Sequence, residues 1–133
     1  MASPQNFGSK LTALVVDDNM INRKIHQKML NNFGVKTHGV ENGKEAVDIH
    51  WYGQKFDLIL MDMDMPIMNG IEATKKLRAM GICSTIIGVS SRSMEAEILK
   101  FMEAGLDDYQ EKPLDNSKLN SILDKVKHNF ISK

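Results

Sequence analysis

Short apolar segments alternate with longer segments of helical periodicity, five times along the chain. The clearest apolar segment is Leu58–Met61, whose consecutive apolar residues are typical of a strand covered on both faces of a sheet. The other strand-like segments are 11–16, 35–39, 85–89 and a short stretch around Tyr109. This alternation predicts an α/β fold, a single doubly wound five-stranded parallel sheet with helices on both faces.

The intervening segments predict helices at about 20–33, 43–52, 71–80, 94–104 and 116–131. The first can be capped by Asp18 or Asn19, and Gly34 stands where a left-handed residue would end it. Apolar side chains of the first helix are close to one helical face, which predicts that they point to the core: Met20, Ile21, Ile25, Met29, Leu30 and Phe33. Trp51 and Tyr52 are interpreted as a packing pair at the rim of the second helix.

The length of 133 residues fits one domain, and we expect residues 11–133 to form it after a flexible segment at 1–10. The 17 Lys and Arg residues balance the 17 Asp and Glu residues, so the chain has no net positive charge that would favour binding to nucleic acid. No apolar run approaches the roughly 20 residues that span a bilayer. The single Cys83 cannot form an internal disulfide, which favours a reducing location in the cytoplasm or the nucleus. We expect a monomer that binds neither nucleic acid nor membrane.

Five polar residues follow or end the predicted strands: Asp17, Asp18, Asp62, Ser90 and Lys112. The carboxyl ends of parallel strands lie at one edge of a sheet, and ligands of open α/β sheets bind there. The sequence therefore predicts that these five side chains gather at that edge.

Three carboxylates in a small volume repel one another, and a hard divalent cation relieves the repulsion. Mg²⁺, or Mn²⁺ in its place, accepts oxygen ligands and keeps several waters. A carboxylate can also act as a nucleophile and form an acyl phosphate. The ammonium of Lys112 and a hydroxyl near Ser90 would then stabilise charge on the phosphoryl oxygens.

Four motifs in this order extend the pattern: V-V-D-D-N at 15–19, L-M-D-M-D-M-P-I-M-N-G at 60–70, I-I-G-V-S-S at 86–91 and Y-Q-E-K-P at 109–113. Together they resemble the receiver domain of two-component response regulators, over roughly residues 11–128. The resemblance implies a flavodoxin-like receiver fold. It also implies a signalling phosphoacceptor rather than an enzyme with a separate substrate.

The resemblance implies that Asp62 is the phosphoacceptor. It assigns Mg²⁺ to Asp17, Asp18 and Asp62, together with the backbone carbonyl of Asp64. The carboxylate of Asp64 is an additional acid beside the acceptor, and it would influence the lifetime of an acyl phosphate.

The remaining motif residues match the part of the family that responds to the phosphoryl group. Ser90 matches the switch hydroxyl, although threonine is more frequent there, and Lys112 matches the lysine that pairs with the phosphoryl group. Tyr109 matches the aromatic switch residue. Pro113 matches a proline that usually follows a cis bond.

Within the family, the chain is similar to the short plant response regulators without an output domain, which implies cytokinin-type signalling. The implied donor is a histidine-containing phosphotransfer protein or a histidine kinase. A receiver excised from a hybrid histidine kinase would show similar motifs, and a sink that drains phosphate from a phosphotransfer protein would need the same residues.

Two other classes of protein share parts of this pattern. A haloacid-dehalogenase-type phosphotransferase shares the spacing of Asp62–Met63–Asp64, but places it early in the chain and adds a cap domain. A flavodoxin-like cofactor binder needs a glycine- and hydroxyl-rich loop where this chain has Asp17–Asp18–Asn19. Each residue also has a purely structural reading, such as a helix cap for Asp18, and only their combination points to the phosphorelay.

Overall fold

The computed structural model describes residues 11–91 and 94–132, so the segment 1–10 predicted to be flexible lies outside the described residues. Five parallel strands form one sheet in the order β2-β1-β3-β4-β5. Their bounds are β1 Thr12–Val16, β2 Lys36–Val40, β3 Leu58–Asp62, β4 Thr85–Ser90 and β5 Asp108–Glu111. The helices are α1 Met20–Asn32, α2 Gly43–Trp51, α3 Gly70–Ala79, α4 Glu95–Glu103 and α5 Asn116–Ser132. The predicted fold class is confirmed.

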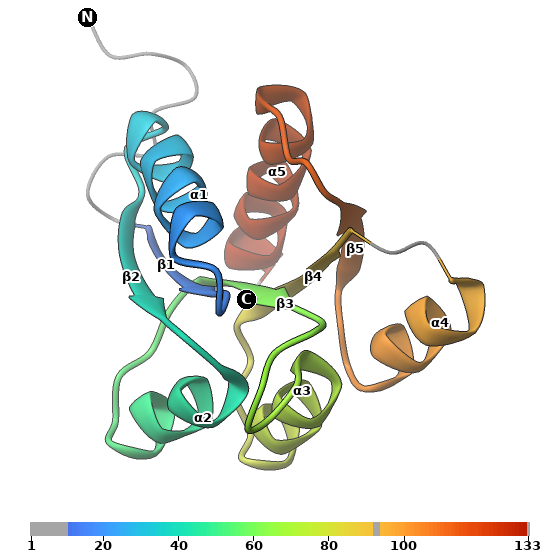
Figure 1. The fold of residues 1–133 in the computed structure, drawn as a ribbon. Coiled ribbons are helices and arrows are strands. Elements are labelled where there is room, and N and C mark those ends of the chain that lie inside the picture. Colours follow the sequence, from blue (N-terminus) through green and yellow to red (C-terminus); the bar gives the residue numbers. More distant parts are fainter. Residues whose placement is uncertain (1–10, 92–93, 133) are drawn as a thin grey trace, which may run out of the picture.

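Helices cover both faces of the sheet, with α1 and α5 on one face and α2, α3 and α4 on the other (Figure 1). The first face packs against Leu30 of α1 and Leu119 and Ile122 of α5. The second packs against Ala46 of α2, Leu77 of α3 and Phe101 of α4. The two layers of apolar side chains therefore bury the central strands from both sides, which is why those strands are continuously apolar in sequence. Among the described residues, no helix is both long and apolar enough to cross a membrane.

The central strands are the most buried part of the molecule. All five residues of β3 and all six of β4 are buried, whereas β5 is only partly buried along its length. This difference follows from strand order, because β2 and β5 lie at the edges of the sheet.

Asparagine side chains begin three of the helices. Asn19, Asn42 and Asn69 accept from backbone N–H groups in the first turns of α1, α2 and α3. Asn69 is part of a capping box with Glu72. Gly34 has φ of 85°, as predicted for the residue that ends α1.

The prediction for the inner face of α1 is wrong in its first two turns. Met20, Ile21 and Ile25 are 57%, 66% and 49% exposed, while His26 and Leu30 are buried. The buried stripe runs through a polar residue, and Ile25 is turned about 100° away from His26 on the helix. The apolar pattern of this helix was misleading because the polar His26 takes an inner position, whereas apolar residues such as Ile21 and Ile25 take outer ones.

Trp51 and Tyr52 do not form a packing pair at the rim of α2, because they are 75% and 85% exposed. They lie where α2 ends, and the chain turns away at Gly53, which has φ of 102°. The inner side of this helix is instead formed by Ala46 and His50.

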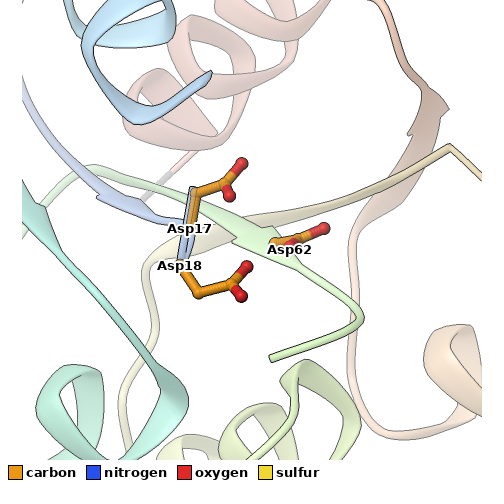
Figure 2. Close-up of side chains that lie close together, drawn as sticks. All are labelled: Asp17, Asp18 and Asp62. Atoms are coloured by element: carbon orange, nitrogen blue, oxygen red, sulfur yellow. The ribbon is translucent and has the colours of Figure 1, made fainter. Parts of the chain in front are cut away.

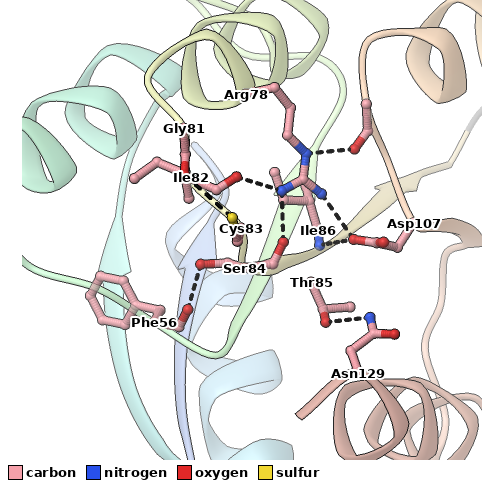
Figure 3. A network of polar contacts seen from close by, with 11 residues as sticks. Phe56, Arg78, Gly81, Ile82, Cys83, Ser84, Thr85, Ile86, Asp107 and Asn129 are labelled. Atoms are coloured by element: carbon pink, nitrogen blue, oxygen red, sulfur yellow. Dashed lines mark hydrogen bonds and ion pairs between the residues drawn. The ribbon is translucent and has the colours of Figure 1, made fainter. Parts of the chain in front are cut away.

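Arg78 joins two connections at the edge of the sheet where the strands begin (Figure 3). Its guanidinium donates to the carbonyl oxygens of Gly105, Ile82 and Ser84 and pairs with Asp107 at 2.9 Å. The carboxylate of Asp107 also accepts from the N–H of Ile86 in β4. One side chain therefore fixes the connection from α3 to β4 against the connection from α4 to β5.

We expect Arg78→Met to lower the free energy of unfolding by about 2–4 kcal/mol, because it leaves several partly buried oxygens without their charged donor. Lys75→Met removes a charge from an exposed position of the same helix and should change stability by no more than about 0.5 kcal/mol. Urea unfolding of both variants measures the difference. Equal stability of the two variants would show that the Arg78 contacts contribute little.

Candidate functional site

The structure gathers the five predicted residues where the strands end. Asp17 and Asp18 follow β1, Asp62 ends β3, Ser90 ends β4, and Lys112 follows β5. Figure 2 shows the carboxylates of Asp17, Asp18 and Asp62 beside one another. Asp17, Asp62 and Ser90 are buried, whereas Asp18 is exposed. The predicted placement at one edge is thus confirmed, while the roles assigned to these residues remain predictions.

The three carboxylates have the geometry to hold one cation. One oxygen from each of Asp17, Asp18 and Asp62 lies within 4.8 Å of the others. All three are hard, anionic oxygen donors, and one side of the cluster is open at the exposed Asp18. This donor set fits Mg²⁺ or Mn²⁺ with water in the remaining positions.

Lys112 contacts two of these carboxylates from the far end of the chain. Its Nζ lies 3.0 Å from Oδ2 of Asp17 and 3.2 Å from Oδ1 of Asp62. Burial opposes the charge of Lys112, but the hydrogen bond to Asp17 and the charges of Asp62 and Asp17 outweigh it and raise the pKa of the lysine. Lys112 is therefore a fixed ammonium directly beside the candidate phosphoacceptor.

The carboxyl of Asp62 is in an unfavourable environment for its charge. Burial raises the pKa of Asp62 from 3.8 to about 6, Lys112 opposes that rise, and the charges of Asp17 and Asp18 add to it. Asp62 is thus a carboxylate that loses solvation and meets like charges, which is characteristic of functional sites.

Asp17 is held in place by its own surroundings. Its Oδ1 accepts from the N–H of Asn19 at 2.9 Å, and its backbone carbonyl accepts from Arg23 at 2.8 Å. The contribution of Arg23 was not predicted from the sequence, because nothing in a lone arginine on a helix indicates that it reaches back six residues to a strand end.

His26 is a second residue that the sequence did not single out. It is buried on α1, and burial together with the charge of Lys112 lowers its pKa, while Asp17 acts in the opposite direction. A neutral His26 next to the site avoids adding positive charge beside Lys112.

The switch candidates lie on the two neighbouring strands β4 and β5. The carbonyl of Ser90 accepts from the N–H of Lys112 at 2.9 Å, and the hydroxyl of Tyr109 lies 3.5 Å from the same carbonyl. Tyr109 is partly buried against the core, and burial raises the pKa of its phenol. The Lys112–Pro113 bond is cis, as the motif implied.

Asp64 lies two residues beyond Asp62 in the connection to α3, and it is exposed. The assignment of its carbonyl to the metal stays a prediction. The same connection contains Ile67, which is 77% exposed and has φ of 72°. A positive φ is unfavourable for a β-branched side chain, so this loop holds an apolar residue outward in a strained conformation.

The chain belongs to the family of response regulator receiver domains, whose model matches residues 13–124. It is 65% identical over 123 residues to Two-component response regulator 24 of Arabidopsis thaliana, a match covering 92% of this chain and 88% of the relative. It is 44% identical over 115 residues to Two-component response regulator ARR22 of the same plant, covering 85% of this chain and 81% of that one.

A solved structure gives the same result for the fold. The receiver domain of sensor histidine kinase PA1611 from Pseudomonas aeruginosa PAO1 superposes with a TM-score of 0.77 at 29% identity. The match covers 86% of this chain and 95% of that domain, which was crystallised with a magnesium ion coordinated in its active site cleft. Membership of this family decides against the two alternatives, a phosphotransferase with a cap domain and a flavodoxin-like cofactor binder.

We expect Asp62→Asn to stabilise the metal-free protein at pH 7.5 by on the order of 1–3 kcal/mol, since one pKa unit corresponds to about 1.4 kcal/mol. At that pH the carboxyl is ionised in both the folded and the unfolded chain, so the folded state bears the full unfavourable difference. As the pH falls from about 6 toward 3.8, folded Asp62 is protonated first and the advantage of the amide fades.

Urea unfolding in the presence of a chelator, at pH 7.5 and at pH 4, measures this effect. Asp124→Asn, an exposed position on α5, serves as the control and should show little difference at either pH. An Asp62→Asn protein that is no more stable than wild type at pH 7.5 would contradict the assignment of unfavourable charge to this carboxyl.

Proposed function

We propose that the chain is a phosphorelay receiver that accepts a phosphoryl group on Asp62 from a phosphohistidine donor. The observation that supports this most directly is the position of Asp62, buried at the end of β3, with Lys112 Nζ at 3.2 Å and two further carboxylates close by. In the transfer, a carboxylate oxygen of Asp62 bonds to phosphorus while the bond from phosphorus to the donor imidazole nitrogen breaks. The products are an acyl phosphate and a free histidine.

Residues Asp17, Asp18 and Asp62, with the carbonyl of Asp64, would hold Mg²⁺. Such a cation supplies charge neutralisation at the phosphoryl oxygens. The chain's own residues do the rest: Asp62 attacks, and the Lys112 ammonium approaches a phosphoryl oxygen in place of the unmodified carboxylate. Asn19 and Arg23 keep Asp17 in place by binding its Oδ1 and its carbonyl.

The response to phosphorylation would begin at Ser90. Its hydroxyl can turn to a phosphoryl oxygen on the neighbouring strand end, because Val89 is directly opposite Asp62 in the pairing of β3 and β4. Tyr109 already touches the carbonyl of Ser90 and is only partly buried, so it can follow a change there. We propose this pair as the switch of the domain.

The donor is proposed to dock on the exposed apolar side chains that flank the site. The first of them is Met20, two positions after Asp18, and Ile21 and Ile25 follow on the same helix. Ile67 lies five positions after Asp62. A donor must place its imidazole at Asp62, so a protein donor that approaches over the start of α1 would cover the exposed apolar side chains there. Exposed apolar side chains next to a reaction site favour protein contact over water.

The two relatives of similar length are two-component response regulators, which supports a short regulator more than a receiver taken from a longer kinase. Whether such a regulator transmits a signal or drains phosphate depends on how long the acyl phosphate persists. The exposed Asp64, two residues after Asp62, is the residue that we propose to influence this lifetime by orienting a hydrolytic water.

Asp62→Asn should abolish transfer of labelled phosphate from a phosphorylated histidine-containing phosphotransfer protein, because the amide is a poor nucleophile. Removal of divalent ions from wild-type protein with a chelator should also stop transfer, and added Mg²⁺ or Mn²⁺ should restore it. Asp124→Asn is the matched control and should be labelled at the wild-type rate. Full labelling of Asp62→Asn would overturn the assignment of the phosphoacceptor.

Ile21→Gln should slow transfer from the phosphotransfer protein by about tenfold, equivalent to about 1.4 kcal/mol, because it removes apolar contact without adding charge near the carboxylates. Labelling by the small donor acetyl phosphate should stay at the wild-type rate, since that donor needs no docking surface. Leu99→Gln on α4, 59% exposed, is the control for losing an exposed apolar side chain elsewhere. Equal slowing with both donors would place the effect of Ile21 in the site rather than in docking.

A further inference from the structure

The sequence contains the pair Asn–Gly twice, at Asn42–Gly43 and Asn69–Gly70, and both pairs lie where a helix begins. Asn–Gly is especially prone to spontaneous deamidation, because glycine has no side chain to hinder attack by its own nitrogen. That nitrogen attacks the side-chain carbonyl carbon of asparagine, and the amide group leaves as ammonia with the proton of the glycine N–H. Water then opens the resulting succinimide ring to aspartate or to isoaspartate, in which the backbone runs through the side chain.

The fold requires glycine at both positions. A Cβ at Gly70 would collide with the carbonyl oxygen of Asp62, and a Cβ at Gly43 would lie 2.6 Å from the carbonyl oxygen of Met68. Both oxygens belong to backbone, of the last residue of β3 and of the connection from β3 to α3. The starts of α2 and α3 therefore approach this backbone too closely for a residue with a side chain, and the reactive pairs are a consequence of packing.

In the folded protein, three features oppose ring closure at Asn69. The N–H of Gly70 donates to the carbonyl oxygen of Met63 at 2.9 Å, so the attacking nitrogen is engaged. Oδ1 of Asn69 accepts from the N–H of Glu72 at 2.9 Å, which holds the side-chain amide over the first turn of α3. The ψ angle of Asn69 is 174°, which keeps the Gly70 nitrogen staggered from the side chain, whereas the ring needs the two eclipsed. Deamidation at Asn69 therefore requires this turn to open.

Asn42 has the same protection and is more deeply buried. The N–H of Gly43 donates to the carbonyl oxygen of Met68 at 3.0 Å, Oδ1 of Asn42 accepts from the N–H of Glu45 at 2.9 Å, and ψ of Asn42 is 174°. Asn42 is only 7% exposed, and its capping hydrogen bond is partly buried. Asn69 is less buried, and its capping hydrogen bond is exposed. The two pairs thus differ in how easily water and an open conformation reach them.

The connection that leads into Asn69 has features that favour opening. Pro66 and Ile67 are exposed, and Ile67 has φ of 72°, which is unfavourable for a β-branched residue. An exposed, strained connection opens at a lower cost in free energy than a buried helix start. Opening frees the Gly70 N–H and lets ψ of Asn69 rotate, while the side chain of Asn42 stays buried at the start of α2.

We propose that, of the two pairs, Asn69–Gly70 is the one that deamidates in the folded protein, and that isoaspartate formed there disables the site at Asp62. Isoaspartate adds one carbon to the backbone before Gly70. Gly70 can then no longer keep both its hydrogen bond to Met63 and its close contact with Asp62. The loss of phosphoryl transfer rests on the proposed function, whereas the position of the deamidation does not.

Peptide mapping by mass spectrometry measures deamidation at both pairs in the full chain, incubated at pH 8.5 and 37 °C with and without enough urea to unfold it. In the folded protein Asn69 should convert at least about fivefold faster than Asn42, and in urea the two rates should agree within about twofold. Conversion of Asn42 as fast as Asn69 in the folded protein would overturn the proposal. An equally large difference in urea would also overturn it, because neighbouring sequence rather than the fold would then set the order.

Glu72→Ala tests control by the turn, because the Glu72 carboxylate completes the capping box by accepting from the N–H of Asn69. The rate at Asn69 should rise by at least about twofold, and the rate at Asn42 should not change. Glu45→Ala is the matched change at the start of α2, where Oε1 of Glu45 accepts from the N–H of Glu41, and it should leave the rate at Asn69 unchanged. An unchanged rate at Asn69 in Glu72→Ala, or equal acceleration there by both variants, would overturn the proposal.

Transfer of labelled phosphate from a phosphorylated histidine-containing phosphotransfer protein is measured on the same samples. Labelling of the wild type should fall in proportion to the isoaspartate at position 69. Asn69→Ser, which keeps a capping side chain without an amide, should keep its initial labelling rate throughout the incubation. Full labelling of protein that carries isoaspartate at position 69 would overturn the proposed effect on the site. Fresh wild-type protein that accepts no phosphate would overturn the proposed function instead, and the mass measurements would still decide where the chain deamidates.

Discussion

The ion pairs of Lys112 with Asp17 and Asp62 are the interactions on which the site depends. Parallel strands force the carboxylates that end them toward one edge, so the fold itself creates the repulsion. Lys112, 95 positions from Asp17 in the chain, places an ammonium 3.0 Å from one carboxylate and 3.2 Å from the other. The β5 strand that leads to it is short and only partly buried. These contacts therefore help to hold the edge strand in place and offset the repulsion between the buried acids. The group that we propose to meet the phosphoryl oxygens thus also stabilises the resting state.

The edge of the sheet where the strands begin and the edge where they end differ in their interactions. At the edge where strands begin, Asp57 accepts from the N–H of Thr12 at 2.8 Å, Ser84 donates to the carbonyl of Phe56, and Arg78 joins the surrounding connections. These are satisfied, attractive contacts. At the edge where strands end, like charges meet and a carboxyl with a raised pKa is held in place. Between them, β3 and β4 are buried along their whole length. Favourable packing and hydrogen bonds at one edge thus permit an electrostatically unfavourable arrangement at the other, where we propose that phosphoryl transfer takes place.

The periodicity of the sequence was sufficient for the fold, because a consecutive apolar run such as Leu58–Met61 is stable only between two layers of helices. The site residues followed from their position at strand ends, together with the resemblance of four motifs to a known family. The inner face of α1 could not be predicted, because its buried position is taken by the polar residue His26, while the apolar residues Ile21 and Ile25 are exposed. The contacts of Arg23 and Arg78 were also not predicted from the sequence, because each joins residues whose proximity is decided only by tertiary packing.

Strand order separates the proposed input from the proposed response. Asp62 ends β3, which lies between β1 and β4 in the sheet. The helix that follows β1 carries the exposed apolar side chains proposed for donor docking, and it covers one face of the sheet. The residues proposed as the switch, Ser90 and Tyr109, lie on β4 and β5, on the other side of β3. A donor seated on α1, as proposed, would therefore leave β4 and β5 free to respond while it is bound.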